Sequence, residues 1–227
     1  MINIQLVKYA LTAAMRDKLI LSMFVMFVLG ACLSVFFGSA AVIEKDEFTV
    51  VFAAGGLRIL SVMGLVLFVI FFIRRSFDSK DIDFLLSRPI GRISLIFSYF
   101  LAFTILCFLM SVAVVLVVYA VSPHIYSNAY ILWGVSILVE SIIMISAALF
   151  FSMYISSASN AAMVTMGFYV LGRMMGQLIG IIDSSLIDGS GALAMALQVV
   201  SVVTPRLDLL GQSSWLVYGL DGTDIGL

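Results

Sequence analysis

Three charged residues stand inside long uncharged stretches of this 227-residue chain: Arg58, Glu140 and Arg173. A charge near the middle of a bilayer-spanning helix costs about 2.5–3.5 kcal/mol on insertion scales, so such residues usually face other charged groups or water. At 1.5 Å per helical residue, Glu140 and Arg173 both lie about 14 Å from the same end of their stretches. The sequence therefore predicts a Glu140–Arg173 ion pair with Arg58 nearby.

This intramembrane polar cluster of Arg58, Glu140 and Arg173 has two possible roles. Charges inside a membrane protein often line the path of a substrate or ion. The same charges would equally serve as a structural pair that holds two helices in register, because breaking a buried pair is costly. The sequence leaves both interpretations open.

Motifs for catalysis or cofactor binding do not appear elsewhere in the chain. There is no Gly-rich loop followed by Lys-Ser/Thr, so the sequence predicts no ATP site of its own. The single histidine, His124, has no Gly-x-Ser-x-Gly partner motif, and the spacing of Cys32 and Cys107 matches no metal site. We therefore expect neither an enzyme nor a metal or cofactor site in this chain.

The composition indicates that Arg58, Glu140 and Arg173 belong to a membrane protein. Hydrophobic residues make up 63% of the chain and charged residues 11%, whereas soluble domains have about 45–50% and about 25%. The net charge of −1 provides no basic surface for nucleic acid. Because only closed barrels and helices satisfy their backbone in lipid, and the apolar runs are long, we predict an all-α, polytopic transmembrane bundle.

A bilayer core about 30 Å thick needs about 20 apolar residues per helix, which gives five spans in this chain. The uncharged run between residues 93 and 139 is too long for one span, and Ser122-Pro123 divides it. The predicted transmembrane bundle, 19–182, contains spans at about 19–41, 50–73, 93–121, 130–153 and 161–182.

The distribution of basic residues predicts the orientation. Of the 12 Lys and Arg residues, eight lie in the N-terminal segment or in the loop 74–92, and two lie on the opposite side. Short cytoplasmic loops are enriched in Lys and Arg. We therefore expect the N-terminus and the loop 74–92 to face the cytoplasm.

Two terminal segments are not predicted to cross the membrane. Residues 1–18 combine an apolar stripe with basic residues, which is typical of an amphipathic helix on the inner leaflet; a cytoplasmic extension of the first span is the alternative. In 183–227, the apolar run 192–203 is too short to span, so we expect a re-entrant or interfacial segment on the outer face.

The last predicted span carries Gly172, Gly176 and Gly180 at four-residue spacing. Small residues at this spacing form a flat helix face that another backbone can approach closely. The sequence favours packing within the molecule over a homodimer interface.

The loop 74–92 has the features of a docking surface for a cytoplasmic partner. Pro89 disfavours a helical conformation at Arg88, so a short helix should end there. A helix that only anchors the bundle at the interface is the alternative. The residues predicted to contact the partner are Phe77, Asp81, Ile82, Phe84, Leu85 and Arg88.

The end of this loop reads Leu85-Leu86-Ser87-Arg88-Pro89-Ile90-Gly91-Arg92. It resembles the Leu-Leu-Ser-x-Pro-aliphatic-Ser/Thr-Arg motif of permease subunits in type-2 ATP-binding-cassette (ABC) exporters, with Gly91 in place of the hydroxyl residue. The N-terminal segment resembles the connecting helix of that family. Pro205-Arg206-Leu207-Asp208, with the apolar run before it, resembles the outer helical region before the family's last span.

The resemblance implies a permease with six spans, a second permease copy or homologue, and two separate cytoplasmic ATPase subunits that bind ATP and Mg. The part of the loop near Phe77 to Leu86 would then be the coupling helix, and the transporter would lie in a bacterial cytoplasmic (inner) membrane. Five spans depart from this pattern, so a sixth would lie beyond residue 227 or the assembly would differ.

Two other classes of protein remain possible from the sequence, and the substrate is not identified. A non-catalytic membrane scaffold or assembly factor would also carry a docking loop. A lipid-modifying enzyme would need clustered carboxylates, and Asp78, Asp81 and Asp83 are the one such group.

Overall fold

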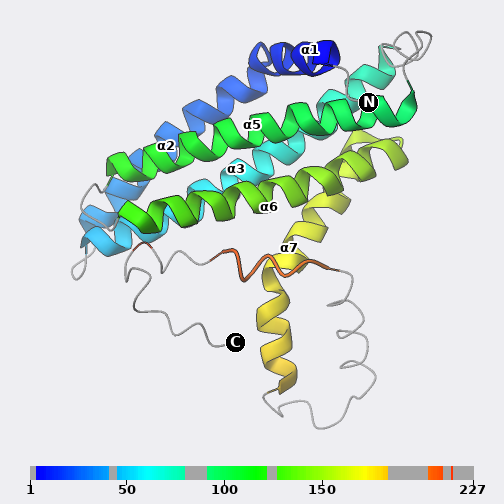
Figure 1. Cartoon of the computed structure of the whole chain (residues 1–227). Coiled ribbons are helices and arrows are strands. Elements are labelled where there is room, and N and C mark those ends of the chain that lie inside the picture. The colour runs from blue at the N-terminus through cyan, green and yellow to red at the C-terminus, as the bar shows by residue number, and fades with distance from the viewer. Residues whose placement is uncertain are drawn as a thin grey trace.

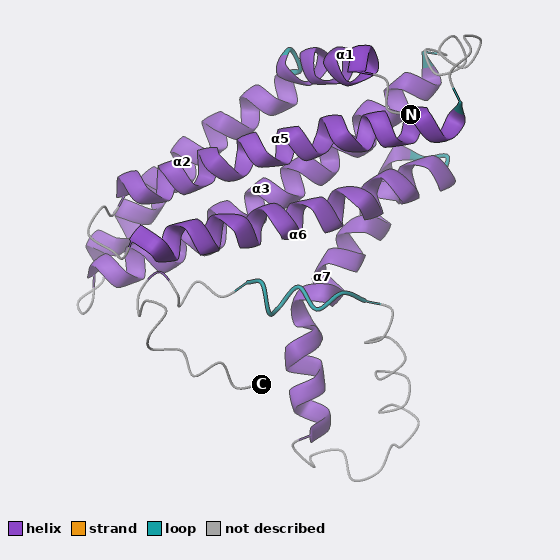
Figure 2. Ribbon diagram, viewed as in Figure 1, coloured by secondary structure: helices purple, strands orange, loops and turns teal. Residues whose placement is uncertain are grey.

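The computed structural model describes residues 4–40, 45–79, 91–121, 127–183, 204–211 and 216. All regular structure within these residues is α-helical, as Figures 1 and 2 show, so the predicted all-α class is confirmed for them. The six helices are α1 (Ile4–Met15), α2 (Lys18–Ala40), α3 (Lys45–Asp78), α5 (Arg92–Val121), α6 (Ser127–Tyr154) and α7 (Ala158–Asp183).

Four of these helices, α2, α3, α5 and α6, are long and apolar enough to cross a membrane. They run along one another as a bundle (Figure 1), with α3 in contact with each of the other three. Each overlaps one of the first four predicted spans. The chain is thus a multi-pass membrane protein with four candidate spans among its described residues.

The central position of α3 follows from its side chains. Phe68, Val69 and Ile70 are fully buried on different sides of this helix, so protein packs against several of its sides at this level. In α2, by contrast, Val28 and Phe36 are more than half exposed, as apolar side chains facing lipid would be.

The helix α3 is longer than the sequence predicted. We expected it to end at about residue 73, where the basic residues begin, but it continues to Asp78. No proline or glycine interrupts residues 73–78. Ser79 lies in the turn that follows, and its N–H donates to the carbonyl oxygen of Arg75 over 2.9 Å. The first residues of the predicted loop 74–92 are therefore part of the helix.

A fifth crossing by α7 stays a prediction, as does the orientation of the bundle. The helix covers the predicted range 161–182, but it is less apolar and is not among the four candidate spans. Asn160, Arg173 and Gln177 reduce its apolar character. Its first half approaches the bundle, where it contacts α3 and α6, and its second half is directed away (Figure 1).

The helix α1 lies across one end of the bundle and packs mainly on α5 (Figure 1). Leu6, Ala10 and Ala14 are buried, whereas Lys8 is exposed, so the helix is amphipathic. Between α1 and α2, the carboxylate of Asp17 accepts the N–H of Leu19 over 2.9 Å. Asp17 therefore caps the N-terminus of α2 at the point where the chain changes direction.

Candidate functional site

The structure brings the three residues of the polar cluster together from three helices. Glu140 of α6 accepts a hydrogen bond from Nε of Arg58 in α3, and both side chains are completely buried. Nη1 of Arg173, in α7, lies 3.7 Å from the other carboxylate oxygen of Glu140.

The order of the two contacts differs from the prediction. The sequence predicted Arg173 as the partner of Glu140 and Arg58 as a neighbour, whereas Arg58 makes the hydrogen bond and the closer ion pair. Arg173 is 22% exposed, so part of its charge is solvated. The reason is the course of α7, which runs obliquely away from the bundle, whereas α3 lies alongside α6 (Figure 1).

The polar cluster carries one more positive charge than negative charge, since two guanidinium groups face one carboxylate. Both terminal nitrogens of Arg58 are buried and have no hydrogen-bond acceptor in the described part of the chain. A buried donor without an acceptor costs about 1–3 kcal/mol, and more when it is charged. The cluster can therefore accept a further anionic or hydrogen-bond-accepting group.

The glycine face of α7 is covered by the segment 204–211. Leu207 is fully buried there, and its N–H donates to the carbonyl oxygen of Gly172 over 3.2 Å. A Cβ atom at Gly172 would lie 3.0 Å from the Leu207 side chain, and one at Gly176 would collide with Asp208. At Gly180 a Cβ atom would meet no atom of the described residues within 4 Å. Two of the three glycines thus pack against the same chain.

A cavity of about 440 Å³ adjoins the polar cluster. Its lining combines a cation, a carboxylate and an amide from two segments: Arg173, Gly176, Gln177, Asp208 and Gly211. A Cβ atom at Gly211 would collide with the guanidinium of Arg173, so the glycine leaves room for this side chain. Arg173 therefore links the buried pair to the cavity.

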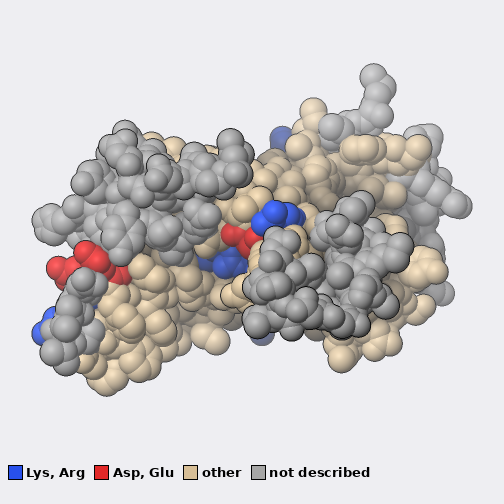
Figure 3. All heavy atoms as spheres, turned by 90° about the horizontal axis from the view of Figure 1, so that it is seen from below, with Lys and Arg blue, Asp and Glu red and all other residues tan. Residues whose placement is uncertain are grey.

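Asp208 of this lining is paired with a basic side chain. Arg206 lies 3.2 Å from Asp208, and the two side chains are 44% and 19% exposed. Figure 3 shows basic and acidic side chains close together near the middle of the face that is seen from below. Arg173, which is 22% exposed and lines the cavity with Asp208, thus lies between the buried pair and partly exposed charges.

Of the residues predicted to contact a cytoplasmic partner, Phe77 is described. Its side chain is 38% exposed, and the guanidinium carbon of Arg74 lies 5.5 Å from the centre of its ring. The other residues of this set lie outside the described residues: Asp81, Ile82, Phe84, Leu85 and Arg88.

Two residues near the polar cluster were not predicted from the sequence as site residues. Tyr169 precedes Arg173 by one helical turn and is 4% exposed, so its spacing from Arg173 was a usable signal. Asp208 had no such signal, because its position depends on how the chain returns to α7.

No protein-family model matches the chain, and no curated protein matches its sequence.

Proposed function

We propose that this chain is the membrane-spanning permease subunit of an ABC exporter in a bacterial cytoplasmic membrane. It would move its substrate by alternating access, driven by a separate cytoplasmic ATPase. The observation that carries the transport part is the polar cluster, which is buried in an apolar bundle, has an excess positive charge and adjoins a cavity.

The charge balance favours a substrate path over a purely structural pair. A structural pair needs only one cation and one anion, and a second cation adds desolvation cost without improving the pairing. Arg173 is this second cation, and it lines the cavity. We infer that the cavity accepts a substrate group that is anionic or rich in hydrogen-bond acceptors.

The continuity of α3 provides a physical route for coupling. One uninterrupted helix carries both Arg58 in the polar cluster and Phe77 at its far end. Phe77 is 19 positions after Arg58, which corresponds to about 28 Å along the helix axis. A partner that pushes on Phe77 would move Arg58 as part of one rigid body, which is how packed helices transmit displacement. The identity of the partner as an ABC ATPase rests on the resemblance of the loop 74–92.

The test is to purify the tagged protein from its native membranes and identify what accompanies it. We expect a stoichiometric soluble subunit with a P-loop. Phe77→Asp should release this subunit, and so should Phe84→Asp. Phe48→Asp is the matched control, because Phe48 is 46% exposed in the first turn of the same helix, at the opposite end.

The variants must melt at the same temperature as the parent protein for the comparison to count. Reproducible absence of any ATPase from the intact parent protein would contradict the exporter proposal. It would favour the alternative of a non-catalytic membrane scaffold or assembly factor.

A further inference from the structure

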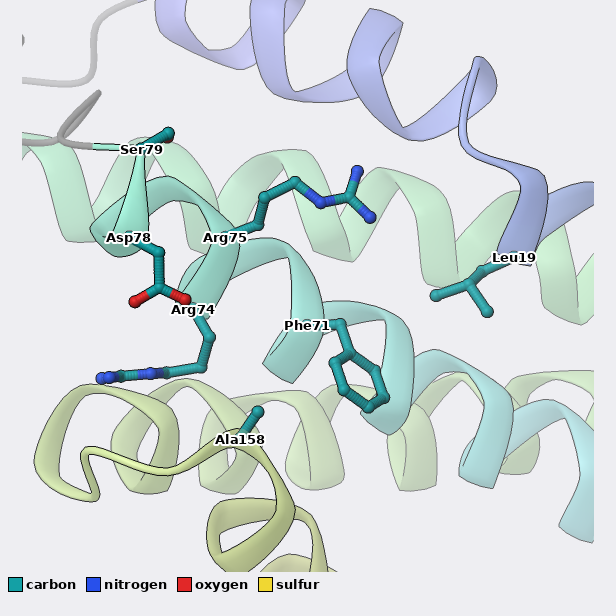
Figure 4. Close-up of a pocket in the computed structure, with 7 residues that line it drawn as sticks. All are labelled: Leu19, Phe71, Arg74, Arg75, Asp78, Ser79 and Ala158. Atoms are coloured by element: carbon teal, nitrogen blue, oxygen red, sulfur yellow. The ribbon is translucent and has the colours of Figure 1, made fainter.

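A second cavity, of about 550 Å³, lies at the other end of α3. Four of its lining residues are Phe71, Arg74, Arg75 and Asp78, whose spacing of three and four places them on one face of the helix. Leu19, in the first turn of α2, and Ala158, at the start of α7, complete the walls. Figure 4 shows this arrangement. The cavity is therefore formed where the ends of three helices meet.

The two arginines of this cavity are not equivalent. Arg74 is held by the carbonyl oxygen of Ser152, 3.5 Å from its Nη1, and by the ring of Phe77. Arg75 extends in the opposite direction, towards α2 (Figure 4). Its side chain is 68% exposed, and its ion pair is with Asp17 at 3.3 Å. Arg75 is thus the cation that can reach a ligand at the surface of the bundle.

The wall beside Arg75 is apolar and open to the outside of the bundle. Leu19 and Phe71 are 37% and 40% exposed, although both belong to candidate membrane spans. A cation at the end of these spans therefore lies next to side chains that face lipid chains. An amphiphile with an anionic head and an apolar tail would match both the cation and the apolar wall.

The surrounding charges favour an anion. The joint between α1 and α2 and the end of α3 contain four basic residues and two acidic ones, a local charge of +2 (Arg16, Asp17, Lys18, Arg74, Arg75 and Asp78). The N-terminus of α2 adds the positive end of a helix dipole. Basic pockets between the ends of membrane-spanning helices are suited to anionic lipid headgroups.

We propose that this cavity binds an anionic phospholipid. Arg75 contacts the phosphodiester of the headgroup, and Leu19 and Phe71 contact an acyl chain. The proposed ligand-binding residue differs from the predicted coupling residue: Phe77 contacts Arg74 but does not line the cavity, and Arg75 extends the other way. The proposal does not depend on the exporter function.

The test measures lipid binding by the purified full chain in a neutral detergent, by titration with phosphatidylglycerol and native mass spectrometry. Arg75→Gln should weaken binding about five-fold, the factor that corresponds to one basic residue near a membrane surface. Lys45→Gln is the matched control, since it removes one positive charge from an exposed residue at the opposite end of α3, away from both cavities. This control should bind as the parent protein does.

A second variant separates a lipid site from a structural ion pair. Asp17→Asn removes the charge that competes for Arg75 but preserves the cap of α2, because asparagine caps as well as aspartate. Lipid binding should therefore become tighter. If Asp17→Asn weakens binding as Arg75→Gln does, the pair only ties the helices together and the proposal is wrong.

Two further outcomes would overturn the proposal. Equal losses in Arg75→Gln and Lys45→Gln would mean that the lipid responds to overall charge alone. Full competition by inorganic phosphate, at the same concentration as the lipid, would assign the site to a free anion. Phosphatidylcholine should compete more weakly than phosphatidylglycerol, since its choline group offsets the charge of the phosphodiester.

Discussion

The strongest prediction concerns the ion pair between Arg58 and Glu140, which is completely buried. Glu140→Leu removes the carboxylate and leaves the Arg58 guanidinium in the core without its anion. Loss of one partner of a buried pair costs about 3–5 kcal/mol. Arg173 cannot replace the lost interaction, because it carries the same charge as Arg58. We therefore expect Glu140→Leu to be among the most destabilising single substitutions in the bundle.

The double variant Arg58→Met/Glu140→Leu should recover most of this loss. It removes both buried charges and fills the space with apolar side chains, a change that is often neutral or stabilising. Arg173→Met alone should cost less than about 1 kcal/mol, because partly exposed pairs contribute little, and Arg173 is 22% exposed. Adding Arg173→Met to Glu140→Leu should accordingly restore less of the lost stability than adding Arg58→Met does.

The assay is thermal unfolding in detergent, checked by denaturant titration in mixed micelles. A loss of about 3–5 kcal/mol corresponds to roughly 6–20 °C in Tm for a chain of this size. Val139→Leu is the control for a substitution next to Glu140, since Val139 is 38% exposed. Additive losses in Arg58→Met and Glu140→Leu would refute the reasoning, because uncoupled residues do not form a pair.

Two packing predictions use the same assay. Gly172→Val should lower the free energy of unfolding by about 1–3 kcal/mol, because the new side chain would press on Leu207 and on the Pro205 carbonyl. Gly180→Val should cost little in steric terms, because no described atom lies near that position. Equal losses in the two variants would contradict packing by the segment 204–211. Ser111→Ala should cost about 1 kcal/mol, since its hydroxyl donates to the Gly134 carbonyl across α5 and α6 over 2.8 Å. The exposed Ser146→Ala should be neutral by comparison.

The sequence predicted the candidate spans well because the bilayer imposes a simple rule. Long uncharged runs must become helices, and Pro123 separates two such runs. The end of α3 was misplaced because the sequence signal was the change in polarity at Arg74. A helix needs a breaker or a cap to end, and none precedes Ser79.

The polar cluster was found because charges within apolar helices are rare. Counting residues gave the depth of Glu140 and Arg173, but depth does not determine which helix faces which. For that reason Arg58 was placed nearby and not as the main partner. The contribution of Asp208 depends on the return of a distant segment, which no local pattern predicts.

The proposed function requires that the polar cluster belong to a substrate path, which a separate ATPase would open and close. Gln177 lines its cavity, so Gln177→Cys, in a chain with Cys32 and Cys107 replaced by alanine, reports access to it. Leu171→Cys is the control, because Leu171 is 46% exposed on the same helix and does not line the cavity. We predict that ATP changes the rate at which a membrane-impermeant maleimide labels the Gln177→Cys variant, but not the Leu171→Cys variant, in native membrane vesicles. Identical labelling of the Gln177→Cys variant with and without ATP, while the ATPase is bound, would contradict the account.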